Sequence, residues 1–105
     1  MSNQKFDQFH YDVGQFIGLR AHVKGGDILD EKNIDFCTSM FRRAFGREGY
    51  EGFNAKKIKE HASESMEWAK NTNLKPIEFR VVVNQMYNCI EDSIRVYNSE
   101  VTRES

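Results

Sequence analysis

The side chains best suited to chemistry are two carboxylate–histidine pairs, each with a spacing of three residues. Asp7 precedes His10, and His61 precedes Glu64. In a helix this spacing puts both side chains on one face, as in the di-metal sites of four-helix proteins. Those sites take Glu-x-x-His from two helices and a carboxylate from each of two more. Here one pair uses Asp and the other is reversed, so the sequence predicts no metal site.

The remaining nucleophiles and bases form no catalytic motif. Cys37 and Cys89 have no neighbouring base in the sequence, and neither a Gly-x-Ser-x-Gly motif nor a phosphate-binding loop is present. Both cysteines fall within apolar helical stripes, so we expect them to be reduced core residues without a disulfide. His22 precedes a Gly-Gly turn, where a solvated histidine is ordinary. The sequence therefore predicts a protein that is not an enzyme and has no cofactor.

Charge is distributed unevenly along a chain whose net charge is only −1. Residues 42–59 contain six Lys or Arg and two Glu, a local net charge of +4, whereas residues 27–35 carry a local −3. Near-neutrality overall argues against a general nucleic-acid coat protein, which is normally basic. The asymmetry can steer a partner, or pair copies of the chain head to tail. A partner site is therefore expected within the basic segment.

Residues 40–62 combine basic and aromatic side chains around a glycine-rich joint between two expected helices. Aromatic residues on such a joint either fold back on the core or act as binding anchors. For Tyr50 and Phe53 we favour folding back, and the alternative role as binding anchors is the best argument for a protein partner. The leading hypothesis is a small regulatory interaction protein that binds another protein. Its predicted partner surface consists of Arg42, Arg43, Arg47, Tyr50 and Phe53.

The alternative hypothesis is a nucleic-acid-binding regulator that uses three lysines at the start of the third expected helix. They are Lys56, Lys57 and Lys59. Cations are unfavourable beside the positive end of a helix dipole, and a bound phosphate would reverse that penalty. The plain interpretation is a solvated face, with Lys56 paired to Glu60 and Lys70 paired to Glu67. DNA binding by a helix-turn-helix is not expected, because the eight-residue joint is longer than the usual turn.

Hydrophobic spacing and capping residues predict an all-α fold, a compact bundle of about four helices. Asp30 and Asn54 are suitable N-caps, and Pro76 suits the first position of the last helix. Gly46 should end the second helix. Residues 46–53 contain three glycines and should therefore not form a helix. The chain is expected to form a single domain over 1–105, with residues 1–5 and 98–105 frayed. The expected helices are 6–23, 30–46, 55–70 and 76–97.

Two features predict how these helices pack. Gly14 and Gly18 lie four residues apart on the first helix, where they would allow another backbone to approach closely. In the last helix, Phe79, Val83, Met86, Ile90, Ser93 and Tyr97 follow a heptad spacing. The apolar face around this seam is wide enough for the centre of a bundle or for a homodimer. Residues 77–83 also alternate like a strand, but the continuing helical spacing favours a helix.

The hydropathy of the chain indicates where in the cell the protein is expected. Neither a signal-peptide-like run at the N-terminus nor an apolar stretch of membrane-spanning length is present. We therefore expect a cytoplasmic protein without membrane contact. Apolar residues make up 39% and charged residues 30%, as in globular rather than disordered chains.

Overall fold

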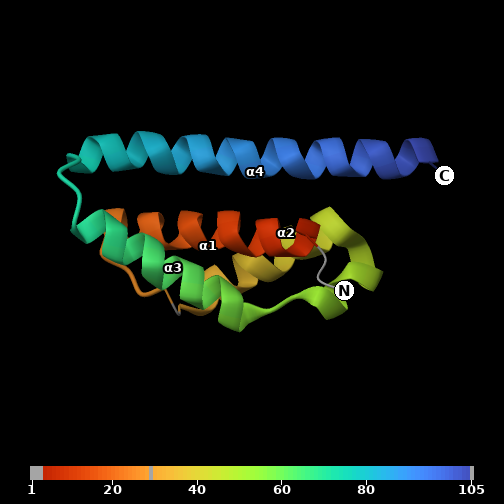
Figure 1. Cartoon of the computed structure of the whole chain (residues 1–105), viewed down its shortest axis with the longest axis horizontal. Coiled ribbons are helices and arrows are strands. Elements are labelled where there is room, and N and C mark those ends of the chain that lie inside the picture. The colour runs from red at the N-terminus through yellow and green to blue at the C-terminus, as the bar shows by residue number, and fades with distance from the viewer. Residues whose placement is uncertain (1–3, 29, 105) are drawn as a thin grey trace.

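The computed structural model describes residues 4–28 and 30–104, and the side chains within them except at 4, 5, 48 and 100–104 (Figure 1). Four α-helices follow in the order α1 (Gln4–Lys24), α2 (Glu31–Gly49), α3 (Ala55–Lys70) and α4 (Pro76–Glu104), with a 3₁₀ turn, η1 (Tyr50–Gly52), before α3. The described chain contains no strand, so the predicted all-α bundle is confirmed. Expectations for residues 1–3 and 105 lie outside the described residues. The helix α4 runs to Glu104, through most of the tail for which fraying is expected.

The predicted helix starts are confirmed by their caps. The Asp30 side chain accepts a hydrogen bond from the backbone N–H of Lys32, and that of Asn54 accepts one from Lys57. Pro76 is the first residue of α4, and residues 77–83 are helical. No helix among the described residues has both the length and the apolarity needed to cross a bilayer.

The central element is α1, which contacts each of the other three helices. In Figure 1, α4 lies as a long rod along one side, and α1 runs between α4 and α3, whereas α2 contacts both α1 and α4. Phe9, Val13 and Ile17 of α1 are buried, and rings from α2 pack against them. The Phe9 and Phe41 rings, for example, meet edge to face at 5.3 Å. Of the two explanations for the wide apolar face of the last helix, a central position in the bundle therefore does not apply, because α1 occupies it.

Gly14 and Gly18 bring α1 and α3 into close contact, as their spacing predicts. A Cβ on Gly14 would lie 2.6 Å from Cβ of His61, and one on Gly18 would lie 2.2 Å from the carbonyl oxygen of Ala62. The facing side of α3 is built of small residues, including buried Ser65, whose hydroxyl donates to the Gln15 carbonyl at 3.0 Å. The two backbones therefore touch with little side chain between them.

The prediction that residues 46–53 form no helix is wrong in part. Gly46 does break α2, with φ of 70° and ψ of −166°, a conformation that glycine adopts without strain. Helical turns nevertheless resume and continue as η1. They pack closely on aromatic rings, because a Cβ on Gly52 would lie 2.2 Å from the Phe6 ring. Glycine at that position serves close packing rather than chain flexibility.

The helix α4 packs on the bundle from one side only, which corrects two predictions about its face. Ser93, placed on the seam by its spacing, is exposed, whereas Ile94 beside the seam is buried. Cys89 is exposed and free, so only Cys37 of the two cysteines is a core residue. Val96 is 57% exposed. The apolar face of α4 is wider than the surface that covers it.

Candidate functional site

Three of the five residues of the predicted partner surface line one hollow at the end of α2. Arg42, Arg47 and Tyr50, together with Gly46, surround a volume of about 450 Å³. The guanidinium of Arg42 lies over the Tyr50 ring, 4.9 Å from its centroid, which is cation–π geometry. In the described chain neither arginine takes part in an ion pair. The hollow therefore presents two uncompensated cations around a ring.

The two aromatic residues of the joint play different parts. Phe53 is half-buried and packs edge to face on the buried Phe41 ring at 5.4 Å, so it folds back on the core as we favoured. Tyr50 lies parallel to Phe53, with centroids 6.2 Å apart and planes 4° apart, and is 40% exposed. A continuous stack thus leads from the core through Phe53 and Tyr50 to the guanidinium of Arg42.

Arg43 points away from this hollow and joins α2 to α4. Its guanidinium donates two hydrogen bonds to the carboxylate of Glu91, at 3.0 and 2.9 Å. The Asn98 side-chain amide of α4 also donates to the Arg43 carbonyl, at 3.1 Å. This arginine therefore has an intramolecular role, which the sequence does not reveal because its partner lies 48 residues away.

The three lysines of the alternative hypothesis lie at the start of α3, and one is already paired. The Lys57 ammonium lies 3.1 Å from the Asp7 carboxylate, and both side chains are about half exposed. Lys56 and Lys59 are exposed. The ion pairs expected from helical spacing, Lys56 with Glu60 and Lys70 with Glu67, are not formed between these described side chains.

Buried His10 fixes the joint before α3 and was considered in the sequence only as a metal ligand. Its Nε2 accepts a hydrogen bond from the backbone N–H of Asn54 at 2.8 Å, and its Nδ1–H donates to the Phe6 carbonyl. The acceptor role of Nε2 requires the neutral ring. Burial lowers the pKa of His10, outweighing the Phe6 hydrogen bond that raises it. The sequence signal for this structural role was the position of His10 beside the apolar stripe of α1.

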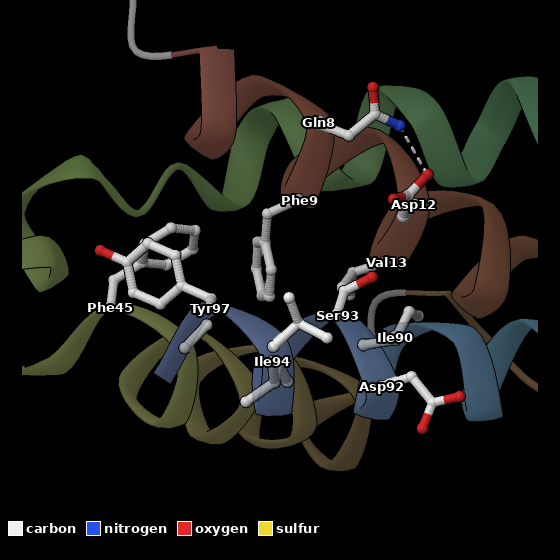
Figure 2. Close-up of a pocket in the computed structure, with 12 residues that line it drawn as sticks. Gln8, Phe9, Asp12, Val13, Phe45, Ile90, Asp92, Ser93, Ile94 and Tyr97 are labelled. Carbon is white, nitrogen blue, oxygen red and sulfur yellow. Dashed lines mark hydrogen bonds between the residues drawn. The ribbon is translucent and has the colours of Figure 1, made fainter. Parts of the chain in front are cut away.

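An apolar groove runs between the first half of α1, α2 and the second half of α4 (Figure 2). Its volume is about 470 Å³, and Phe9, Phe45, Ile94 and Tyr97 are among the residues that line it. The carboxylate of Asp12 lies at its edge and accepts a hydrogen bond from Gln8 at 2.9 Å. Burial raises the pKa of Asp12. This groove is the space left where α4 covers the bundle incompletely.

The carboxylate–histidine pairs do not assemble a catalytic or metal centre among the described residues. Asp7 pairs with Lys57, and both nitrogens of His10 are engaged as described above. The Nδ1 of His61 lies 3.6 Å from the Glu64 carboxylate, beyond hydrogen-bonding distance, and its ring packs against Tyr11 at 5.2 Å. Within the described ranges, no three His, Cys, Asp or Glu side chains are grouped to hold a metal ion.

A second group of cations is brought together by the fold and was missed in the sequence. It surrounds two adjoining hollows at the other end of α2, and its members come from three helices: Arg20, Lys24, Lys32 and Arg80. These residues span 60 positions of the chain, so no local charge count reveals them.

Comparisons with protein-family models, with curated proteins and with solved structures find no match to this chain.

Proposed function

We propose that this chain is a small, non-enzymatic regulatory protein of the cytoplasm that binds an acidic segment of another protein through the partner surface. The observation that carries the proposal is the hollow in which Arg42 and Arg47 flank the exposed Tyr50. Arginine and tyrosine are the residue types that most often dominate protein interfaces. Two arginines without a carboxylate partner in the described chain favour an acidic occupant.

The stacked arrangement favours binding because it reduces the entropy lost on association. Ordering a flexible side chain at an interface costs about 0.5–1.5 kcal/mol. The Tyr50 ring already contacts the Arg42 guanidinium and the Phe53 ring, and Phe53 is anchored on the core ring of Phe41. The contact residues in this proposal are Arg42, Arg47 and Tyr50. Phe53 and Arg43 position these residues. Phe53 packs parallel to the Tyr50 ring, and Arg43 fixes α2 on α4 through Glu91.

The test is selection of a random peptide library on the wild-type protein, followed by affinity measurement of the selected peptides on variants. We expect acidic peptides, and we expect Arg42→Glu/Arg47→Glu and Tyr50→Ala each to weaken binding by about tenfold or more. The control is Lys56→Glu/Lys59→Glu, which makes the same change in net charge nearby. Circular dichroism verifies that each variant is folded. If Arg42→Glu/Arg47→Glu is unfolded, the milder variant Arg42→Gln/Arg47→Gln takes its place. Selected peptides that bind all variants equally would exclude this surface.

The alternative, a nucleic-acid-binding regulator, is supported by one observation at the start of α3. Lys56 and Lys59 are exposed, and among the described residues neither pairs with a carboxylate. Binding there would show in titrations of labelled oligonucleotides between about 50 and 200 mM salt, because each phosphate contact adds roughly one unit to the slope of log affinity against log salt. Lys56→Glu/Lys57→Glu would abolish it. A peptide bound at Tyr50 would instead lose affinity in Arg42→Glu/Arg47→Glu and keep it in Lys56→Glu/Lys57→Glu.

A homodimer is a further proposal, supported by the apolar residues that α4 leaves uncovered. Ile77 is 69% exposed and Val81 51% exposed, one helical turn apart on the outer side of α4. Light scattering over a range of concentrations measures the mass directly. A dimer that Ile77→Lys/Val81→Lys converts to a monomer is the expected result, and a wild-type monomer at all concentrations would contradict it.

A further inference from the structure

A concave basic surface lies where the end of α1 meets the beginnings of α2 and α4. Two hollows of about 370 and 500 Å³ adjoin there, since both are lined by Arg20, Lys24, Val83 and Asn84. Volumes of this order suit small-molecule sites. We call the two together the basic hollow. Its polar and aromatic lining residues are Phe16, Arg20, Lys24, Lys32, Phe36, Arg80, Asn84 and Tyr87.

The lining follows from helical spacing on three elements. Arg20 and Lys24 lie four residues apart on α1, and Lys32 and Phe36 lie four apart on α2, so each pair shares a face. On α4, Arg80, Asn84 and Tyr87 follow the same pattern. No carboxylate lines either hollow, although Asp35 follows Lys32 by three residues on α2. The basic hollow therefore gathers cations from three helices without an acidic lining residue.

The cations of the basic hollow are not neutralised within the described part of the molecule. None of the four takes part in an ion pair. Arg20 is oriented by a neutral group, because its guanidinium donates to the Asn33 side-chain oxygen at 2.9 Å. Lys32 is the second residue of α2, where the helix dipole already makes a cation unfavourable. A bound anion would relieve both the mutual repulsion of the cations and this dipole penalty.

An aromatic cluster forms the rest of the lining. Phe16 and Phe36 are stacked with centroids 5.3 Å apart, and Tyr87 packs against both at 5.8 and 6.1 Å. Tyr87 is 37% exposed, so part of its ring remains open. A hydrogen bond to Glu91 raises the pKa of Tyr87. A simple anion such as sulfate would use the cations and leave the exposed part of this ring uncovered.

We propose that the basic hollow binds a nucleotide unit, with the phosphate on its cations and the base stacked on Tyr87. The Asn84 amide offers both a donor and an acceptor to the base or sugar. A nucleotide can come free in solution or as part of a single strand, whose unstacked bases can enter a concave site. This site is independent of the partner surface, which lies about 20 Å away along α2.

The test is calorimetric titration with adenosine monophosphate, adenosine and ribose 5-phosphate, and anisotropy titration with a labelled single strand of about ten nucleotides. The site variants are Lys24→Gln/Arg80→Gln for the phosphate and Tyr87→Leu for the base. The control, Lys70→Gln/Arg95→Gln, removes two exposed cations that line neither hollow and belong to neither of the surfaces proposed above. Thermal unfolding by circular dichroism verifies that each variant is folded.

We expect adenosine monophosphate, the single strand, or both to bind, and each fragment alone to bind at least about tenfold more weakly. Each site variant should weaken binding by a similar factor, and the control should not. If the strand binds much more tightly than the mononucleotide, a nucleic acid is the source. Its salt slope should then fall by about 1.4 in Lys24→Gln/Arg80→Gln, at roughly 0.7 per lost contact.

Four results would overturn the proposal. The first is no binding of either ligand at about 50 mM salt. The second is equal affinity for ribose 5-phosphate and adenosine monophosphate, which would mean that the ring plays no part. The third is loss of binding in the control to the same extent as in the site variants. The fourth is undiminished binding by both site variants.

Discussion

Replacement of Gly18 by alanine tests the contact between α1 and α3, because two effects of opposite sign compete there. Alanine favours a helix interior over glycine by about 1 kcal/mol. A Cβ at this position, however, would lie 2.2 Å from the carbonyl oxygen of Ala62 and 2.9 Å from Cβ of Ser65. Both atoms are part of α3 or close to its backbone, so neither can rotate away. The helices must therefore move apart.

The size of the effect follows from that movement. Ordinary contact begins at 3.4 Å, so the oxygen must recede from 2.2 to 3.4 Å, a shift of about 1.2 Å. Overpacking of this kind costs about 1–3 kcal/mol. The shift also strains the hydrogen bond from Ser65 to the Gln15 carbonyl, 3.0 Å long, which contributes about 1 kcal/mol. After the gain in helix propensity, we expect a net destabilisation of about 1–3 kcal/mol.

The assay is urea unfolding followed by far-ultraviolet circular dichroism, comparing Gly18→Ala with Gly26→Ala. The control is informative because a Cβ on Gly26 would meet no atom within 4 Å. We expect Gly26→Ala to change the free energy of unfolding by no more than about 1 kcal/mol, with a small gain favoured. If Gly18→Ala is as stable as the wild type or more stable, helix propensity dominates and the described packing of α1 on α3 is wrong.

Three further predictions concern the joint, the link between helices and the thiols. Because burial lowers the pKa of His10 from 6.5, the folded state binds fewer protons than the unfolded state below that pH. The free energy of unfolding should therefore decrease as the pH falls from about 7 to 5, and urea titrations of His10→Gln should lack this part of the decrease. The bidentate pair of Arg43 and Glu91 should give a coupling energy of about 0.5–1 kcal/mol in a double-mutant cycle at low salt. A coupling energy of zero would mean that this ion pair does not hold α4 against α2. Cys89 should react rapidly with Ellman's reagent, whereas Cys37, whose pKa burial raises to about 12, should react only on unfolding; two fast thiols would contradict the described core.

The sequence was sufficient to predict the helices because helix ends depend on local chemistry. Asp30, Asn54 and Pro76 act within one turn of themselves, so their roles could be predicted without knowing the fold. The close approach at Gly14 and Gly18 was also predictable, since two glycines one turn apart in a helix are unfavourable unless a backbone packs against them.

The sequence was insufficient where burial depends on what covers a residue. Ser93 and Cys89 lie on the apolar side of α4 by spacing, yet they are exposed because α4 contacts the bundle from one side. The same limit applies to polar contacts between distant segments. The partner of Arg43 and the partner of His10 lie 48 and 44 residues away, and no local pattern links them. The basic hollow was missed for this reason.

The central claim is that the two cationic, aromatic hollows at the ends of α2 are separate binding sites with different ligands. The most direct test titrates a library-selected acidic peptide and adenosine monophosphate against the same two variants, Arg42→Glu/Arg47→Glu and Lys24→Gln/Arg80→Gln. We predict that the first variant loses only the peptide and the second loses only the nucleotide. Loss of both ligands in one folded variant, or of neither ligand in either variant, would contradict this account.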